Sequence, residues 1–346
     1  MHKKSPKVTI GLILYKGEKY LEPCLMSLIN QNYPNFELLT RDQSPNREAY
    51  KYIKKKLPKI FDRLNIEKGE NLLHSGGHNK LINKMKGDYY LCCSQDMWYP
   101  PNFITNIIKE LEKTECKKYG SATCKLMKWN FPLYNHDHPE VSKSNQIDSC
   151  GLGIKKNHHF YDIGQGETDE GQYNDNVNIF GASGALAIYR KEALDSIAYN
   201  QEFFDELIHY KNDIDLAYRL QWAGWPCLFI PEVKVYHDRL ATLPNSSKNR
   251  LIRMIKARKA KSKWIKSNSF FGQQVIILKH FSKKFSLSVK LKTTIYQWIT
   301  LFYTMIFEPY LLKQSRVLKK KEKEIFAKRD AIVRKVKPGA IERLMN

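Results

Sequence analysis

Hydrophobic residues in the first hundred positions occur in short blocks, with a helical pattern between them. Residues 8–15, 36–40 and 88–93 are mainly apolar runs, typical of strands that are buried on both faces. Between the first two runs, apolar residues from Tyr20 to Ile29 recur at the spacing of one helix face. This rhythm predicts an α/β fold with a Rossmann-like, mostly parallel open sheet flanked by helices.

Polar residues gather where the predicted strands end. Asp42 follows the second strand, and Asp96 follows the strand that ends at Cys93. Open parallel sheets bind ligands in the crevice beyond the carboxyl ends of their strands, so both carboxylates are expected there. Residues 125–180 have little periodicity and many His, Asn, Asp and Gly residues, which predicts a long, functional loop region.

A second regular segment follows this region. Residues 181–184 (GASG) lead into a predicted strand, and residues 212–215 (NDID) begin a predicted helix. Two short predicted strands at 227–230 and 233–236 then end at His237. Small residues such as those at 181–184 let a backbone approach a substrate, although they equally permit tight strand packing.

The formal net charge of +23 is concentrated at one end of the chain. Residues 246–346 hold 26 Lys and Arg against 5 Asp and Glu, whereas residues 1–245 hold 32 against 30. The C-terminal region therefore differs from the rest of the chain in its strongly positive net charge, as a separate region would. We predict one α/β domain over residues 1–245 and a basic, amphipathic helical appendage over residues 246–346.

Within the appendage, residues 293–307 carry no charge over 15 positions. That is shorter than the ~18–20 residues that a spanning helix needs. Lysine and arginine flank this run on both sides, which predicts a helix lying in the interface of an anionic membrane surface. A nucleic-acid-binding arm and a solvated helical pair are the alternatives. Because such arms have little use for an uncharged aromatic run, no nucleic-acid partner is expected.

Two features indicate the compartment. The seven cysteines are odd in number and form no C-x-x-C motif, which fits a reducing environment. Residues 1–7 lack the apolar core and cleavage site of a signal peptide. We therefore expect a cytoplasmic protein, bound peripherally to the inner face of the cell membrane.

Several motifs in a fixed order carry a resemblance to a known family. They are a first strand that ends at Tyr15, Asp42, Gly-Gly-His-Asn at 76–79, Ser94-Gln95-Asp96, and Asn-Asp-Ile-Asp-Leu at 212–216 followed by Arg219. Together they resemble glycosyltransferase family 2, whose members have the GT-A fold, over roughly residues 7–240. The glycine-rich segment and the single acid at 96 most resemble the rhamnosyltransferase-like branch.

The resemblance implies a nucleotide-sugar half at about 1–125 and an acceptor half at about 126–245. It further implies a hexosyl-type transfer from a nucleotide diphosphate donor, a dTDP- or UDP-sugar with dTDP-rhamnose as one candidate. The acceptor would be a lipid-linked or polysaccharide glycan of the bacterial surface. A single catalytic base without a second nucleophile predicts inversion at the anomeric carbon.

Donor-side roles follow from the same resemblance. Tyr15, Asp42 and Asn79 would shape the nucleotide pocket, although Asp42 also suits a turn-forming residue that caps its own backbone. Asp96 with His237 would hold a divalent metal ion, Mg²⁺ or Mn²⁺, because a hard cation neutralises a diphosphate leaving group. Ser94 stands where the family has its first motif acid, and we place it with the donor-binding residues.

On the acceptor side, the resemblance makes Asp213 the catalytic base, which takes the proton of the acceptor hydroxyl as the new bond forms. Ala182, Ser183, Asp215 and Arg219 would contact the acceptor. The alternative for Asp213 and Asp215 is helix capping and compensation of the helix dipole. An isolated histidine such as His237 is equally often structural.

Two other functions remain open from the sequence. A sugar nucleotidyltransferase has the same type of fold, but it usually carries a glycine-rich phosphate loop with a basic residue, of which residues 15–18 are a poor version. A catalytically silent GT-A-like protein that binds polyanions or nucleic acid is the second, and the serine at position 94 is its best support.

Overall fold

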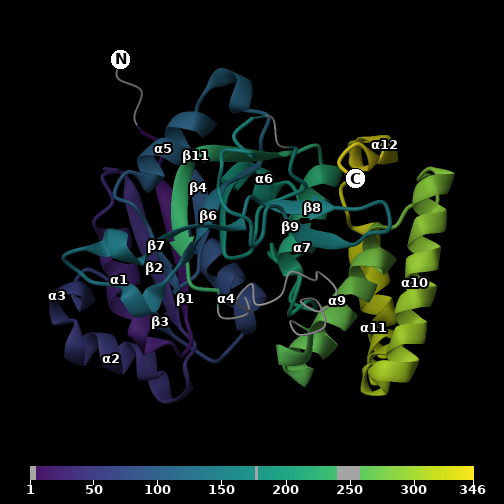
Figure 1. The fold of residues 1–346 in the computed structure, drawn as a ribbon, viewed down its shortest axis with the longest axis horizontal. Helices are drawn as coiled ribbons and strands as arrows, with labels where there is room; N and C mark the ends of the chain where they lie inside the picture. Colours follow the sequence, from purple (N-terminus) through teal and green to yellow (C-terminus); the bar gives the residue numbers. More distant parts are fainter. Residues whose placement is uncertain (1–4, 176–177, 240–257) are drawn as a thin grey trace.

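The structure, a computed structural model, describes residues 5–175, 178–239 and 258–346. Its centre is a nine-stranded sheet in the order β3-β2-β1-β4-β10-β6-β11-β5, with β7 paired to β6. Figure 1 shows this sheet between helices, with the C-terminal helices α9, α10 and α11 along one side of the molecule. The described strands are β1 (Val8–Leu14), β2 (Phe36–Asp42), β3 (Asn65–Lys68), β4 (Tyr89–Cys93), β5 (Met97–Trp98), β6 (Ser121–Trp129), β7 (Lys143–Ser149), β8 (Leu152–Ile154), β9 (Phe160–Asp162), β10 (Leu186–Arg190) and β11 (Cys227–His237).

Helices lie on both faces of the sheet. The described α-helices are α1 (Glu18–Ile29), α2 (Glu48–Lys56), α3 (Pro58–Phe61), α4 (Leu73–Ile82), α5 (Phe103–Leu111), α6 (Lys191–Asp195), α7 (Asn212–Trp222), α9 (Lys263–His280), α10 (Leu287–Phe307), α11 (Lys313–Asp330) and α12 (Pro338–Glu342). Short 3₁₀ turns occur at η1 (Pro45–Arg47), η2 (Thr114–Cys116), η3 (Phe131–Leu133), η4 (Pro139–Ser142) and η5 (Pro309–Leu312).

Alternate residues of β1 explain how both faces are filled. Leu12 and Leu14 belong to the core that α1 and α5 cover, whereas Ile13 packs against the core on the α4 and α7 side. Strands β1 to β4 pair in parallel, and β10 then runs antiparallel to both β4 and β6. The predicted α/β architecture with an open sheet is confirmed, and the sheet is parallel in its N-terminal half and mixed beyond it.

Two predictions about local structure were wrong. Residues 125–180, predicted to be a loop region, contain the second half of β6 and the strands β7, β8 and β9. These strands escaped notice because β7 is mostly polar and the other two are only three residues long. The two short strands predicted around Pro231 are one strand, β11, with an irregular register between Ile230 and Lys234, because proline has no N–H to donate to the ladder.

The C-terminal helices share a core with the acceptor half. Val275 and Ile276 of α9 and Ile325 of α11 are buried in one cluster with Ile154 and Phe160 of the β8-β9 hairpin. The helical appendage is thus present, and its described part, residues 258–346, packs against the main domain. The predicted boundary at 245/246 lies outside the described residues. Among the described helices, no stretch combines the length and the hydropathy that crossing a bilayer requires.

Candidate active site

Asp96 stands just beyond the end of β4, at the edge of the sheet where β10 begins. The backbone N–H of Ser94 donates to the carbonyl of Ala185 at 3.1 Å, which holds the strand end in place. The hydroxyl of Ser94 donates to one carboxylate oxygen of Asp96. The Asp96 side chain is 21% exposed, so its second oxygen can reach a ligand.

That second oxygen faces His237, the last residue of β11. The His237 Nε2 atom lies 3.5 Å from Asp96 Oδ2, and its Nδ1 atom lies 2.8 Å from Asp148 Oδ2 of β7. Burial alone would lower the pKa of His237, but the two carboxylates raise it to about 9. Burial likewise would raise the pKa of Asp96, but His237 and the Ser94 hydroxyl hold it below its usual value.

These residues fit a divalent metal ion. A carboxylate oxygen and an imidazole nitrogen face each other; carboxylate oxygens bind Mg²⁺ and Mn²⁺ in proteins, and the imidazole nitrogen suits the transition-metal ion, Mn²⁺, better than Mg²⁺. The other ring nitrogen of His237 is fixed by Asp148, the arrangement that orients most metal-binding histidines. Sequence reasoning missed Asp148, because it lies 89 residues from its partner and within the region predicted to be a loop.

Arg239 extends this group of charges. Its guanidinium contacts Asp148 Oδ1 at 3.1 Å and Asp162 Oδ2 at 2.8 Å. Three carboxylates, those of Asp96, Asp148 and Asp162, therefore surround one guanidinium and one imidazole. With His237 neutral, two negative charges remain, which a divalent cation would balance. We call these five residues the sheet-edge cluster.

Asp213 lies at the N-terminus of α7, close to the same edge. One of its carboxylate oxygens accepts a hydrogen bond from the N–H of Gly184 at 2.9 Å, and the other accepts from the N–H of Ile214 at 2.9 Å. Burial raises the pKa of Asp213, and the nearby charge of Asp162 adds to the effect, while the Gly184 hydrogen bond opposes it. A carboxyl with a raised pKa is a stronger base once ionised.

Two connections place Asp96 and Asp213 at one edge. Ser94 bonds to Ala185, and the preceding residue, Gly184, bonds to Asp213. Asp162 and Arg239 are members of the sheet-edge cluster, and their charges also shift the pKa of Asp213. A Cβ atom at Gly184 would lie 3.1 Å from Asp213 Oδ2, so glycine is what permits this close approach.

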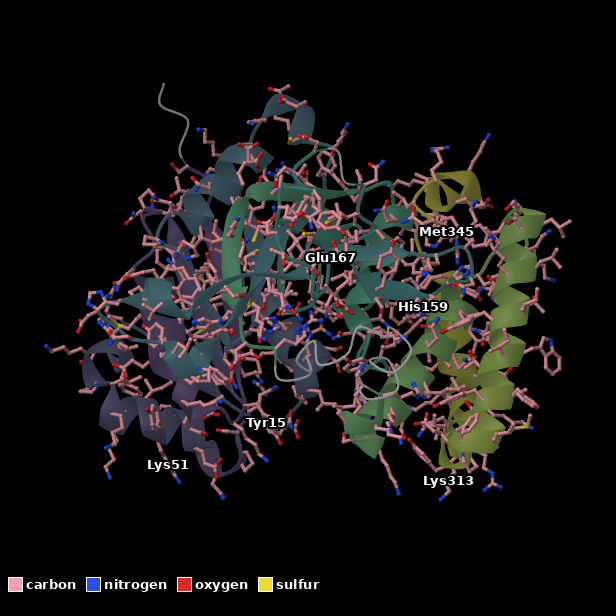
Figure 2. The ribbon with its side chains drawn as sticks, viewed as in Figure 1. Tyr15, Lys51, His159, Glu167, Lys313 and Met345 are labelled. Carbon is pink, nitrogen blue, oxygen red and sulfur yellow. The ribbon has the colours of Figure 1, made fainter. Side chains whose placement is uncertain are left out.

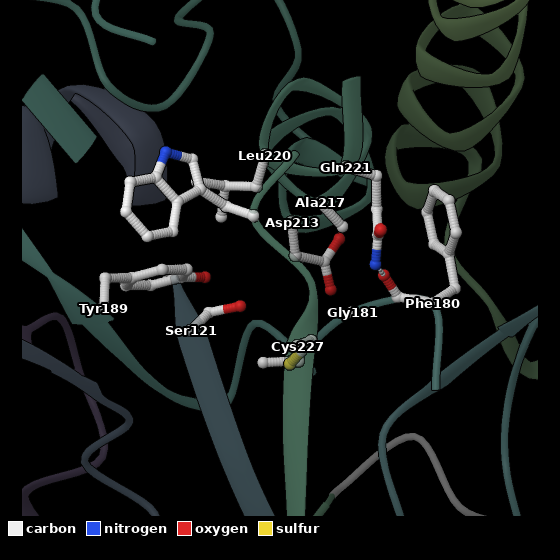
Figure 3. A pocket seen from close by; sticks show the side chains of 11 residues that line it. Ser121, Phe180, Gly181, Tyr189, Asp213, Ala217, Leu220, Gln221 and Cys227 are labelled. Carbon is white, nitrogen blue, oxygen red and sulfur yellow. Dashed lines mark hydrogen bonds between the residues drawn. The ribbon is translucent and has the colours of Figure 1, made fainter. Parts of the chain in front are cut away.

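The other side of Asp213 is core. Figure 3 shows the space beside its carboxylate, lined by residues such as Gly181, Ala217 and Cys227. This space has no room for a water molecule. A ligand therefore cannot reach Asp213 through this space.

Cationic side chains lie near Asp213. The pKa of Lys211 is lowered to about 8, mainly by burial and further by the charges of Lys261 and Arg258, whereas Asp213 opposes the shift. These three cations come from the start of α7 and from the segment before α9. Arg258 is paired with Glu308, so Lys211 and Lys261 are the cations of this group that could meet a phosphate, and no sequence motif singled them out.

His74 supports the segments on either side of Asp213. Its Nδ1 accepts from the Asn212 amide at 2.9 Å, so its Nε2 carries the proton and faces the carbonyl of Gly184 at 3.3 Å. Asn212 in turn accepts from the N–H of Asp213 at 3.0 Å, which fixes the orientation of its amide. His74, His78 and Cys92 lie within 4.8 Å of one another, but this tautomer leaves His74 without a free lone pair toward that group.

The predicted nucleotide-binding residues are only partly open to a ligand. Tyr15 is 40% exposed, and both its backbone N–H and its carbonyl are bonded to the Gln95 amide. Asp42 is buried, and its two oxygens accept from Ser44 and from the N–H of Tyr50. Asn79 is buried as well and bonds to the backbone of Phe203 and Phe204. In this structure the polar atoms of Asp42 and Asn79 are thus bonded within the protein, and their role at the nucleotide stays a prediction.

The predicted acceptor-binding residues are mostly sealed from solvent. Ala182 and Ser183 are about 4% exposed, so little of either side chain reaches solvent. Asp215 is fully buried and pairs with Arg219, Lys279 and His280. The structure thus gives Asp215 and Arg219 a packing role in place of the predicted acceptor contact, because no face of either charge is left free.

Known proteins resemble this chain in sequence. A family model described as Glycosyl transferase family 2 matches residues 9–198, more than half of the chain. Glycosyltransferase GlyA of Streptococcus pneumoniae is 28% identical over 105 residues, which is 30% of this chain and 15% of that protein. Putative glycosyltransferase EpsH of Bacillus subtilis is 24% identical over 106 residues, 31% of this chain and 30% of that protein. The matched stretch thus spans less than a third of either relative.

Solved structures resemble the whole chain. S. aureus TarS 1-349 superposes with a TM-score of 0.53 at 12% identity, over 98% of this chain and 83% of that one. GalNAc-T7, solved with UDP, GalNAc and Mn²⁺, gives a TM-score of 0.52 at 10% identity, over 90% and 58%. At such low identity the likeness shows the fold alone, and it confirms the predicted GT-A architecture.

Proposed function

The chain belongs to glycosyl transferase family 2, and from that premise we propose that it moves a sugar from a nucleotide diphosphate donor to an acceptor hydroxyl, with inversion. The observation that carries the proposal is the meeting of Asp213 and the sheet-edge cluster at one edge of the sheet. Departure of a diphosphate and activation of a hydroxyl require their groups side by side. A catalytically silent scaffold has no need for this arrangement.

On the donor side, Asp96 and His237 would hold a Mg²⁺ or Mn²⁺ ion, with Asp148 fixing the imidazole. When bound, such an ion neutralises the charge that develops on the leaving diphosphate. Lys211 and Arg239 supply further positive charge next to it. A phosphate oxygen beside Lys211 would also return the pKa of that lysine toward its ordinary value, because it offsets the neighbouring cations.

On the acceptor side, Asp213 takes the proton of the attacking hydroxyl. Its carboxylate is held by Gly184 and Ile214 and faces core on its inner side, so the orientation is fixed before the substrate arrives. With one base and no second nucleophile, the hydroxyl attacks the anomeric carbon directly, and the configuration inverts. His74 acts through Gly184 and Asn212 as a positioning residue.

The resemblance also guides the choice of substrates. GalNAc-T7 was solved with UDP and Mn²⁺, and the motifs at 76–79 and 94–96 resemble rhamnosyltransferases. We propose a UDP- or dTDP-sugar donor, with dTDP-rhamnose to be tried first. The acceptor is proposed to be a lipid-linked or polysaccharide glycan made at the inner face of the bacterial membrane.

The Asp213→Asn variant tests the assignment of the base. A positioned general base accelerates a reaction by roughly 10²–10⁴-fold, so turnover of donor with Mn²⁺ should fall by that factor while donor affinity stays within about twofold. Both quantities can be measured on one preparation, by release of nucleoside diphosphate and by calorimetry. The matched control is Asp62→Asn, which removes the same charge at an exposed position.

Undiminished turnover in Asp213→Asn would defeat the role of the base. If the wild-type protein turns over none of the UDP- and dTDP-sugars with either metal, the silent scaffold becomes the better explanation. Formation of a nucleotide sugar from a sugar phosphate and a nucleoside triphosphate would indicate the nucleotidyltransferase instead.

A further inference from the structure

Helix α10 presents its apolar residues to the outside. Its buried residues are Val289, Thr293 and Thr304, so the inward face is largely threonine. Nine large apolar side chains are 50–67% exposed, and together we call them the α10 stripe: Leu287, Leu291, Ile295, Trp298, Ile299, Phe302, Met305, Ile306 and Phe307. Amphipathic helices of globular proteins have the opposite arrangement, and an exposed apolar surface of this length marks an interaction site.

The position of α10 leaves this surface accessible. In Figure 1 the helix stands at the outer side of the molecule, with α9 and α11 next to it and the sheet beyond them. The exposed fractions show that no described residue covers the stripe. Some other surface must do so if the apolar area is to be removed from water.

Charge distinguishes between the two obvious occupants. Helix α10 has no acidic residue, and its only charged residues are Lys290 and Lys292. Residues 246–346 as a whole carry a large positive excess. Packing against a second copy would bring like charges together, whereas an anionic lipid surface complements them.

A pocket of about 310 Å³ opens at the side of the stripe. Ile295 and Ile299, both members of the stripe, form part of its wall. Three lysines also line it, Lys155 and Lys156 from the β8-β9 turn and Lys292 from α10. The three lysines suit the phosphate of an amphiphile, and the apolar wall suits its hydrocarbon chains, which would lie along the helix.

The β8-β9 turn is fixed against the helix. His158 Nδ1 lies 2.9 Å from Thr293 Oγ1, and His159 Nδ1 lies 3.3 Å from the hydroxyl of Tyr296. The hydroxyl of Thr293 also lies 3.3 Å from the carbonyl of Lys156. The backbone that carries the two lysines of the turn is therefore fixed against α10 before any ligand binds, which reduces the entropy that binding costs.

We propose that α10 lies along an anionic phospholipid bilayer, with the stripe in the acyl boundary and one head-group phosphate between Lys155, Lys156 and Lys292. This inference rests on the proposed function only in that a lipid-linked acceptor would be presented at the same surface. It identifies which residues meet the lipid and how the protein is oriented on it.

Vesicle sedimentation tests the proposal, with phosphatidylcholine vesicles that contain or lack phosphatidylglycerol. A lysine near an anionic surface contributes about fivefold to binding. The triple variant Lys155→Gln, Lys156→Gln, Lys292→Gln should therefore bind anionic vesicles on the order of 100-fold more weakly. The double variant Trp298→Ser, Phe302→Ser should lose binding and also the blue shift of tryptophan fluorescence on adding vesicles.

The control removes the same three charges elsewhere, in Lys51→Gln, Lys54→Gln, Lys55→Gln. These lysines are exposed on α2, and Figure 2 shows Lys51 at the opposite end of the molecule from α10. A local site predicts less than a twofold effect of this control. The Asp213→Asn protein should bind vesicles normally while it lacks turnover, which keeps this test apart from that of the enzyme.

Three results would overturn the proposal. Equal losses in the pocket variant and the α2 control would mean that overall charge alone attracts the protein. Equal binding to vesicles without phosphatidylglycerol would exclude the anionic head group. A dimer in gel filtration that Trp298→Ser dissociates would mean that a second copy covers the stripe. Circular dichroism of every variant confirms that the exposed substitutions leave the fold intact.

Discussion

Two clusters of charged side chains, made of similar residues, have different relations to water. The sheet-edge cluster leaves Asp96 21% exposed and carries more carboxylates than permanent cations. The second cluster, formed by Asp205, Asp215, Arg219, Lys279 and Lys328, joins α7 to α9 and α11. Its side chains are at most 9% exposed, and each acid there faces at least two cations. We call it the sealed cluster.

The difference lies in what remains unsatisfied. In the sealed cluster, burial would raise the pKa of Asp215, but Lys279 and Arg219 hold it well below its usual range. Every charge has a partner, so the cluster has nothing left to offer a ligand. The sheet-edge cluster retains negative charge and an open oxygen. The neighbours of an acid on other elements therefore decide whether its charge is used up within the protein or is left for a ligand.

The largest expected effect is on stability, in the sealed cluster. Asp215→Asn removes the carboxylate that Arg219 and His280 face and one of the two that Lys279 faces, in a dry environment, and breaking such a group costs roughly 3–5 kcal/mol. Urea unfolding should show this loss. Asp96→Asn, in the partly open cluster, should change the free energy of unfolding by less than about 1 kcal/mol. Similar losses in the two variants would show that the clusters do not differ as described.

A smaller effect is expected on metal affinity at the sheet edge. Asp148→Asn keeps the size of the side chain but weakens its hold on His237 Nδ1, and loss of such a supporting contact costs roughly 10–100-fold in affinity. Titration calorimetry with Mn²⁺ measures it directly. Asp137→Asn is the control, since its side chain is 87% exposed on the same segment of the chain. Unchanged Mn²⁺ affinity in Asp148→Asn would remove His237 from the metal site.

The smallest expected effect is on pH dependence. The pKa of His237 is about 9 in the metal-free protein, so binding Mn²⁺ must displace a proton. Affinity should therefore rise by up to about tenfold per pH unit between about 7 and 9. Because the folded pKa exceeds the ordinary value of 6.5, the stabilisation from this proton is complete below about pH 6.5 and is lost as the pH rises through about 9.

His237→Gln should abolish both trends. An affinity that does not vary with pH would mean that His237 is already neutral in the metal-free protein. Unfolding of the metal-free protein over the same pH range gives an independent measurement of the same proton.

The sequence predicted those elements that have a local signal, and it failed where an element depends on contacts with residues far away in the chain. Strands β1 and β4 and helix α10 were predicted because a continuous apolar or uncharged run is a local signal. The strand β7 had no such signal, since its fit to β6 is set by partners elsewhere in the chain. Asp148 was missed for the same reason.

The predicted site residues show the same limit. Order and spacing directed attention to Asp96, Asp213 and His237, and the structure brings these residues to one edge. The same spacing also selected Asp215 and Arg219, whose partners Lys279 and His280 lie on α9. No local sequence pattern predicts that α9, a helix of the basic appendage, covers Asp215 and Arg219.

The contact between α9 and the start of α7 makes the two elements one mechanical unit. Lys211, just before the helix, donates to Gln273 at 2.6 Å, and His280 lies 2.8 Å from Asp215. At Gly272 the two backbones are so close that a Cβ atom would sit 2.4 Å from the carbonyl oxygen of Tyr210. A tilt of the C-terminal helices against the main domain would therefore also move the start of α7, which couples the proposed membrane contact of α10 to the orientation of the proposed base, Asp213.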